Sequence, residues 1–179
     1  ARVRSEPDLQ RNLEALRRVR PPLIPPERIS YALGMPWIEP SSYQDFAESL
    51  GLGRPHFVRI PALGQWRIEE SRNASTTGLA TWGTNRMNAW RILDHAFNRV
   101  QPVVWDQIDR DTRVVNATAT EAAVTKVAEL QEAFQSWARE GDHGVALSDR
   151  YNDQMNRVTP WKGNGDYLRT PGVNIAWKW

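Results

Sequence analysis

The eleven residues "ATWGTNRMNAW", from Ala80 to Trp90, combine a glycine with hydroxyl, amide, guanidinium and indole side chains. The apolar spacing that follows predicts a helix that begins inside this stretch. Because the amino end of a helix gathers free N–H groups and a partial positive charge, it is suited to bind phosphate. The surrounding donors make this end a candidate phosphate site. The candidate residues are Thr81, Trp82, Gly83, Thr84, Asn85 and Arg86.

A second stretch, "VVNATATEAA" from Val114 to Ala123, has the same character. Asn116, Thr118 and Thr120 stand where the longest helix is expected to begin. Both helix starts follow predicted strands, so they can face the same side of the molecule. The alternative is that each set of side chains only caps its own helix.

Residues 1–20 hold six arginines against three acidic residues. Arginine offers a planar fork of donors that matches phosphate. Arg17, Arg18 and Arg20 are therefore candidate contacts to a DNA backbone, and the alternative is a solvated helix face beside a partner domain. The whole chain has a net charge of +2, which is too balanced to indicate nucleic-acid binding by itself.

Nine tryptophans are many for 179 residues. Tryptophan can stack on unpaired bases, but it is also a large core residue. Those in helical or strand patterns are expected in the core, namely Trp90, Trp105 and Trp137. Those near the end are expected to pack on a neighbouring domain or to touch a ligand, namely Trp161, Trp177 and Trp179.

Several kinds of chemistry are excluded by what the sequence lacks. Without cysteine there is no disulfide framework, thiol nucleophile or thiolate zinc site. The three histidines are far apart in the sequence and show no local metal-ligand spacing. No G-x-x-x-x-G-K-[ST], H-E-x-x-H or G-x-S-x-G motif occurs. We therefore predict no catalytic residue, no metal ligand and no cofactor for this chain.

The sequence contains no run of about 18 uncharged apolar residues and no signal-peptide pattern at its start. We expect a soluble, intracellular protein. The chain begins without Met and ends at "NIAWKW", as expected of a segment of a longer protein.

Periodic apolar residues flanked by Ser, Thr, Pro and Gly predict a largely helical chain. The expected helices start at Ser5, lie within "PPERISYALG" and "SSYQDFAESLG", and start at Thr84, at Thr118 or Thr120, and at Asp142. Alternating patterns predict two strand pairs, "HFVRI" with "QWRIEE" and "QPVVWDQ" with "TRVVN". The polar stretch "SRNASTTGLATWG" is expected to be a long loop and a candidate working element.

This order of elements predicts an α+β fold, a helix-rich domain with a small, mainly antiparallel sheet and an N-terminal helical arm. The expected parts are the arm at 1–52, an α+β core at 53–157, and an irregular C-terminal extension at 158–179 that leads toward a following domain.

Five stretches carry a family resemblance, in the order "LGMPWI", "ATWGTNR", "VVNATATEAAVTK", "YNDQMN" and "LRTPGVN". In this order the chain resembles the segment that joins two catalytic domains in very large DNA-modifying proteins. These are the DarB-like antirestriction proteins of phages and their relatives on mobile elements. Those proteins carry an adenine-N6 DNA methyltransferase followed by an SNF2-like helicase. The resemblance spans nearly the whole chain.

The resemblance implies a non-catalytic, DNA-associated connector that contacts the DNA backbone or couples the methyltransferase to the helicase. The methyltransferase's Asp/Asn-Pro-Pro-aromatic motif is absent from the chain, as is the helicase's ATP-binding loop. S-adenosylmethionine and ATP with Mg²⁺ are thus expected as cofactors of the whole protein only. The implied partners are DNA and the flanking domains, without a membrane, in the cytoplasm of a bacterial cell.

Two other classes of function stay open. In one, the chain is a structural or protein-interaction spacer that never touches DNA. In the other, it is a small enzyme with a nucleotide site at the "TWGTNR" turn.

Overall fold

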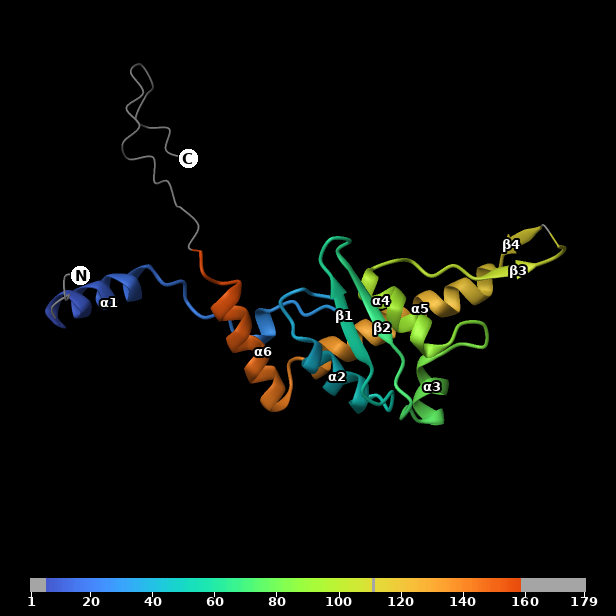
Figure 1. Cartoon of the computed structure of the whole chain (residues 1–179), viewed down its shortest axis with the longest axis horizontal. Helices are drawn as coiled ribbons and strands as arrows, with labels where there is room; N and C mark the ends of the chain where they lie inside the picture. Colours follow the sequence, from blue (N-terminus) through green and yellow to red (C-terminus); the bar gives the residue numbers. More distant parts are fainter. Residues whose placement is uncertain (1–5, 111, 159–179) are drawn as a thin grey trace, which may run out of the picture. The chain divides into compact units, whose positions relative to one another are not determined.

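The computed structural model of the chain describes residues 6–110 and 112–158 (Figure 1). Leu23–Met155 form one compact unit, and the described residues on either side of it belong to a second one. The predicted C-terminal extension therefore lies outside the described residues, except for Val158. The three tryptophans of that extension lie outside them too.

The second unit contains α1 (Glu6–Val19). Its start agrees with the predicted helix. Its apolar stripe is exposed, however, because Leu9, Leu13 and Leu16 are 46%, 52% and 64% accessible. Arg17 and Arg20 are exposed, whereas the side chain of Arg18 lies outside the described part of the chain.

The larger unit combines helices with two antiparallel hairpins, which confirms the α+β fold class. The strands form two separate two-stranded sheets rather than the single small sheet that was predicted. The elements are η1 (Pro26–Arg28), α2 (Pro40–Ser49), β1 (His56–Ile60), β2 (Gln65–Glu69), α3 (Thr76–Trp82), α4 (Ala89–Asn98), β3 (Trp105–Gln107), β4 (Arg113–Val115), α5 (Ala117–Trp137) and α6 (Gly141–Gln154).

An aromatic cluster forms the centre of this unit. The ring of Tyr43 on α2 lies within 4.7–5.8 Å of four other rings, measured between centroids. Those rings belong to Phe57, Trp66, Phe97 and Phe134. The cluster joins both strands of the first hairpin to α2, α4 and α5, and it buries the apolar face of each element.

The predicted boundary of the N-terminal arm, at residues 1–52, is wrong. Residues 23–52 are part of the larger unit. The side chain of Gln131 on α5 accepts from Leu33 N–H at 3.1 Å and donates to Tyr31 C=O at 3.1 Å. Asn152 on α6 clamps the backbone of Ile24 in the same two-sided way, at 2.8 and 2.9 Å. These side chains hold the irregular backbone at Ile24, Tyr31 and Leu33 against helices far away in the sequence. Only the single turn η1 remains of the predicted helix in "PPERISYALG".

The predicted loop "SRNASTTGLATWG" contains the helix α3. Ser75 caps this helix, since its hydroxyl accepts from Gly78 N–H at 2.9 Å. Helix α3 then lies directly on the backbone at Gly51, where a Cβ on Gly78 would come within 2.6 Å of the Gly51 carbonyl oxygen. Tertiary docking on Gly51 therefore stabilises a helix that its small polar residues did not indicate.

No helix in the described part of the chain has the length and apolarity needed to cross a membrane.

Candidate functional site

The two stretches that were predicted as phosphate sites meet at one groove. We call it the polar groove; its volume is about 590 Å³. It is lined by Gly83, Thr84, Asn85, Arg86, Asn116, Thr118, Ala119, Ala122, Thr125 and Lys126. The structure thus brings together six of the predicted residues, four from the first stretch and two from the second. Thr81, Trp82 and Thr120 do not line the groove.

The wall from the first stretch is a turn, not a helix start. Helix α4 begins at Ala89 and is capped by Asn88, whose side chain accepts from Arg91 N–H at 2.9 Å. The predicted cap, Thr84, instead folds the turn before α4, where its hydroxyl accepts from Met87 N–H at 3.0 Å and its own N–H donates to Met87 C=O at 2.8 Å. The expected amino end at Thr84 is therefore wrong, and the polar groove has a polar turn on this side.

Thr81 and Trp82 belong to the last turn of α3. The Thr81 hydroxyl donates to the carbonyl of Thr77 at 2.9 Å, so this side chain satisfies its own helix. Gly83 ends α3 in a crowded position, since a Cβ there would lie 2.8 Å from the Leu79 carbonyl oxygen. A glycine is required here for close packing of the turn on α3.

The wall from the second stretch is the first part of α5. Its cap is Asn116, whose side chain accepts from Ala119 N–H at 2.9 Å, and not Thr118 or Thr120. The Thr120 hydroxyl accepts from Val104 N–H at 3.0 Å and so ties α5 to the residue that precedes β3. The groove face of α5 carries small and polar side chains at helical spacing, which allows a ligand to approach its backbone closely.

Asp106 connects the two walls. One of its carboxylate oxygens accepts from the side chain of Asn116 at 2.6 Å, and the other accepts from the Arg86 guanidinium. Arg86 also donates to the carbonyl of Trp105 at 3.4 Å. Arg86 and Asp106 keep 51% and 41% of their side chains accessible. The pair therefore fixes the position of Arg86 and leaves part of the guanidinium open to a ligand.

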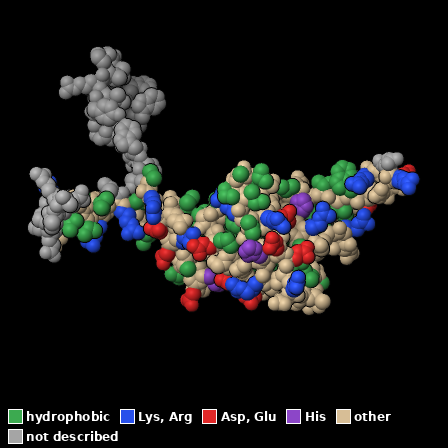
Figure 2. Space-filling model, in the orientation of Figure 1, with side chains coloured by type: hydrophobic (Ala, Val, Ile, Leu, Met, Phe, Trp, Pro, Cys, Tyr) green, Lys and Arg blue, Asp and Glu red, His purple; other side chains and the backbone are tan. Residues whose placement is uncertain are grey.

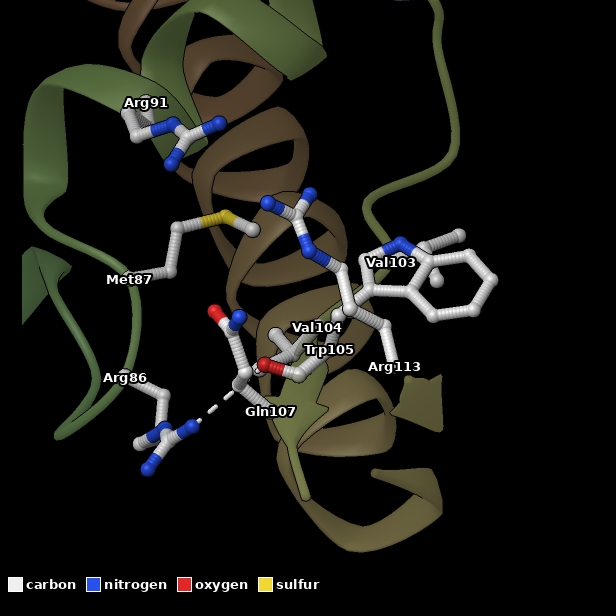
Figure 3. A pocket seen from close by; sticks show the side chains of 8 residues that line it. All are labelled: Arg86, Met87, Arg91, Val103, Val104, Trp105, Gln107 and Arg113. Atoms are coloured by element: carbon white, nitrogen blue, oxygen red, sulfur yellow. Dashed lines mark hydrogen bonds between the residues drawn. The ribbon is translucent and has the colours of Figure 1, made fainter. Parts of the chain in front are cut away.

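Arg86 also lines a second, adjoining hollow of about 290 Å³ (Figure 3). We call it the arginine hollow. It is lined by Arg86, Met87, Arg91, Val103, Val104, Trp105, Gln107 and Arg113. In Figure 3 the Arg113 side chain extends across the hollow toward Met87, and the Arg91 guanidinium lies beyond Met87. Within the described residues, neither Arg91 nor Arg113 forms an ion pair.

The arginine hollow rests on a small apolar cluster. Met87, Ile92, Val104 and Ala123 are buried together, and they hold the start of the β3–β4 hairpin against α4 and α5. The hairpin itself extends past the amino end of α5 in Figure 1. Figure 2 shows basic and hydrophobic side chains next to one another over this hairpin. The three arginines are therefore presented from a packed base, which limits the entropy lost when a ligand binds.

Trp105 was expected in the core, but its side chain is 52% exposed. In the hairpin, Trp105 pairs with Val115 and Gln107 pairs with Arg113, so these four side chains share one face. Val115 is exposed as well, at 43%. The expectation fails because this hairpin is a separate two-stranded sheet, and the described residues leave Trp105 and Val115 about half exposed.

Both hollows are lined by basic side chains, although Arg86 is paired with Asp106. Two basic side chains line the polar groove and three line the arginine hollow, with Arg86 in common and no acidic residue lining either within the described chain. Lys126 is partly compensated, since its ammonium lies 2.6 Å from a carboxylate oxygen of Glu129. The described residues contain no group of three His, Asp or Glu side chains that could hold a metal ion.

Sequence reasoning missed Arg91, Arg113 and Lys126. Each stands a few residues from one of the two predicted stretches, and that proximity was the available signal. Arg17, Arg18 and Arg20, which were predicted as DNA contacts, belong to the other compact unit.

A protein-family model matches this chain. The family is described as "Domain of unknown function (DUF8437)", and the match covers residues 32–157. The chain belongs to the DUF8437 family. Both hollows lie inside the DUF8437 domain, whereas α1 precedes it. No curated protein matches the chain, and no solved structure does.

Proposed function

We propose that this chain is a non-catalytic connector that binds the backbone of DNA through the polar groove and the arginine hollow. The observation that carries the proposal is the convergence of Arg86, Arg91 and Arg113 on adjoining hollows with no acidic lining. Guanidinium groups, hydroxyl groups and amide groups are the usual protein donors to phosphate oxygens. The contribution of contacts to the DNA backbone to such binding is salt-sensitive and independent of base sequence.

The wider context of the proposal comes from the resemblance to DarB-like proteins. In that context the connector positions DNA between an adenine-N6 methyltransferase and an SNF2-like helicase of the same chain. The flanking methyltransferase and helicase would use S-adenosylmethionine and ATP with Mg²⁺, respectively. The chain itself would bind neither. A cytoplasmic setting in a bacterial cell, including delivery by a phage, belongs to the same proposal.

Direct binding to a short fluorescent duplex tests the DNA assignment. At about 50 mM salt, where backbone contacts are strong, we expect Arg86→Ala, Arg91→Ala and Arg113→Ala each to weaken binding by about 3- to 10-fold. Arg59→Ala on β1 is the matched control, because Arg59 is exposed and lines neither hollow. Fluorescence anisotropy gives the dissociation constants. Equal affinity in all four variants and the parent chain would refute the proposal.

Asp106→Asn separates a DNA contact of Arg86 from a purely structural role. The substitution removes a negative charge beside Arg86 and keeps one oxygen that can accept from Arg86, while the amide nitrogen no longer accepts from Asn116. If phosphate binds Arg86, the affinity for duplex DNA rises in this variant. If Arg86 only holds the hairpin in place, the affinity stays the same or falls.

A second candidate function is supported by a different observation, the exposed apolar stripe of α1. Leu9, Leu13 and Leu16 stand on one face of an amphipathic helix, which is a common mode of binding to a partner groove. In that case the chain is a protein-interaction spacer. Absence of any gel shift at about 50 mM salt, together with tight binding of separately expressed neighbouring domains, would favour the spacer over the DNA connector.

The third class, a small enzyme with a nucleotide site at the "TWGTNR" turn, stays a hypothesis. Thermal-shift screening with nucleotides and S-adenosylmethionine tests it, and a rise in melting temperature with one of them would support it.

A further inference from the structure

The tryptophan of the arginine hollow differs from the others in its exposure. Trp37, Trp66 and Trp90 are at most 8% accessible, and Trp82 and Trp137 are half-buried. Trp105 is 52% accessible, and it is the only exposed tryptophan in the part of the chain that the structure describes. An open indole next to unpaired guanidinium groups is an arrangement that a planar, anionic ligand would cover.

The Trp105 indole lies beside two arginines, as a site for a nucleobase and its neighbouring phosphates requires. Trp105 shares one face of the β3–β4 hairpin with Arg113, and Arg91 approaches from α4 across the same hollow. Val103 and Val115 extend the exposed apolar surface beside the ring, at 41% and 43% accessibility. Gln107 adds an amide on the same face, which can donate to or accept from a base edge.

The size of the hollow favours one nucleotide over a duplex. Its volume of about 290 Å³ lies at the lower end of small-molecule sites. In a duplex the faces of the bases are covered by their stacked neighbours, so the Trp105 ring has no base face to contact. An unpaired nucleotide exposes one face of its base and keeps its phosphate within reach of arginine.

We infer that the arginine hollow binds an unpaired nucleotide of single-stranded DNA, with the Trp105 indole stacked on the base and Arg91 and Arg113 on the adjacent phosphates. This inference rests on the proposed function, and it adds the substrate class. The polar groove then follows the backbone of the same strand past Arg86, which borders both hollows.

Titration of fluorescent strands against the parent chain and three variants tests the inference. The probes are a single strand of about 12 thymidines, a duplex of the same length, and the matching oligouridylate. We expect the single strand to bind more tightly than the duplex. Trp105→Ala weakens single-strand binding by between about 5- and 150-fold, which corresponds to the loss of one stacked base, and changes duplex binding by less than about 2-fold.

Two further variants control for the hairpin and for stacking. Val114→Ala lies on the opposite face of the same hairpin, is exposed in the parent chain, and leaves single-strand affinity unchanged. Trp105→Phe keeps an aromatic face and retains most of the affinity. Circular dichroism of each variant shows whether the fold is retained, as expected for an exposed position.

The outcomes separate this inference from the proposed function. If Trp105→Ala leaves single-strand binding unchanged, or lowers single-strand and duplex binding equally, the stacking site is refuted while arginine-dependent duplex binding still supports the connector. If oligouridylate binds as tightly as oligothymidylate or more tightly, the assignment to DNA is overturned. If no probe binds at about 50 mM salt, both proposals fall.

Discussion

Two tyrosine hydroxyls are buried in the same core, and the described residues offer a hydrogen-bond partner to one of them. Tyr43 donates to the carbonyl of Met35 at 3.1 Å. The hydroxyl of Tyr31 has no partner within the described chain, although the residue is 1% accessible. Burial raises the pKa of both hydroxyls, so both remain neutral donors at physiological pH. The core therefore contains one satisfied donor and one that costs free energy.

Replacing a buried tyrosine with phenylalanine usually lowers the free energy of unfolding, and we expect that loss for Tyr43 but not for Tyr31. Tyr43→Phe removes a buried hydrogen bond and lowers the free energy of unfolding by about 1 kcal/mol. Tyr31→Phe removes an unpaired donor and leaves that free energy unchanged or raises it by up to about 1 kcal/mol. Urea unfolding followed by fluorescence measures both variants. A loss of more than about 1 kcal/mol for Tyr31→Phe would mean that its hydroxyl has a partner, such as a bound water.

At the level of single residues, the sequence predicted several residues of the site correctly, but the structural reason given for them was only half right. Gly83, Arg86 and Asn116 were predicted from their types and positions, and they line the polar groove. The reason given was a pair of helix starts, and only the one at Asn116 is present. Thr84 and Asn88 are both good caps, and the sequence does not say which of them the chain uses, because that depends on how the turn packs on α3.

Helix α3 illustrates how packing overrides helix propensity at the scale of an element. Alanine is favoured over glycine inside a helix by about 1 kcal/mol. At Gly78, however, a Cβ would meet the backbone of Gly51 at 2.6 and 2.8 Å and the carbonyl of Leu50 at 2.8 Å. These are backbone atoms, so they cannot rotate away as a side chain can. The contact between α3 and the end of α2 therefore requires glycine.

We predict that Gly78→Ala destabilises the protein by about 1–3 kcal/mol despite its better helix propensity. Thr77→Ala is the matched control one residue earlier, where the side chain is exposed and the expected change is a gain of a few tenths of a kcal/mol. Urea midpoints of the two variants decide between propensity and packing. A Gly78→Ala protein as stable as the control would show that α3 is not closely docked on Gly51.

The elements that were predicted well are those whose pattern is local. The β1–β2 hairpin follows from alternating residues on either side of a glycine turn, and Phe57 and Trp66 are buried as that alternation requires. The stretch "PPERISYALG", residues 25–34, was predicted as a short helix, and only the single turn η1 forms there. The partners of this stretch and of the residue before it, Gln131 and Asn152, come from helices about 100 or more residues away, as the separations of 98, 100 and 128 residues show. Such long-range hydrogen bonds have no signature in a local sequence window.

The whole chain presents its basic side chains on two compact units. Arg86, Arg91 and Arg113 belong to the unit of residues 23–155, and Arg17 and Arg20 belong to the other. Because the net charge is only +2, any affinity for DNA must come from these local groups and not from the overall field. The number of arginines that contact phosphate then fixes how steeply the affinity falls with salt.

We predict a slope near −4.5 for the logarithm of the duplex association constant against the logarithm of salt concentration, if about five arginines from both units contact phosphates. Arg17→Ala and Arg86→Ala each make this slope less negative by about 1, because each removes one phosphate contact. Arg59→Ala leaves it unchanged. Anisotropy titrations between about 50 and 200 mM salt give the slopes. A slope near −2.7 that Arg17→Ala does not alter would assign DNA contact to the arginines of the two hollows alone, and exclude α1 from the interface.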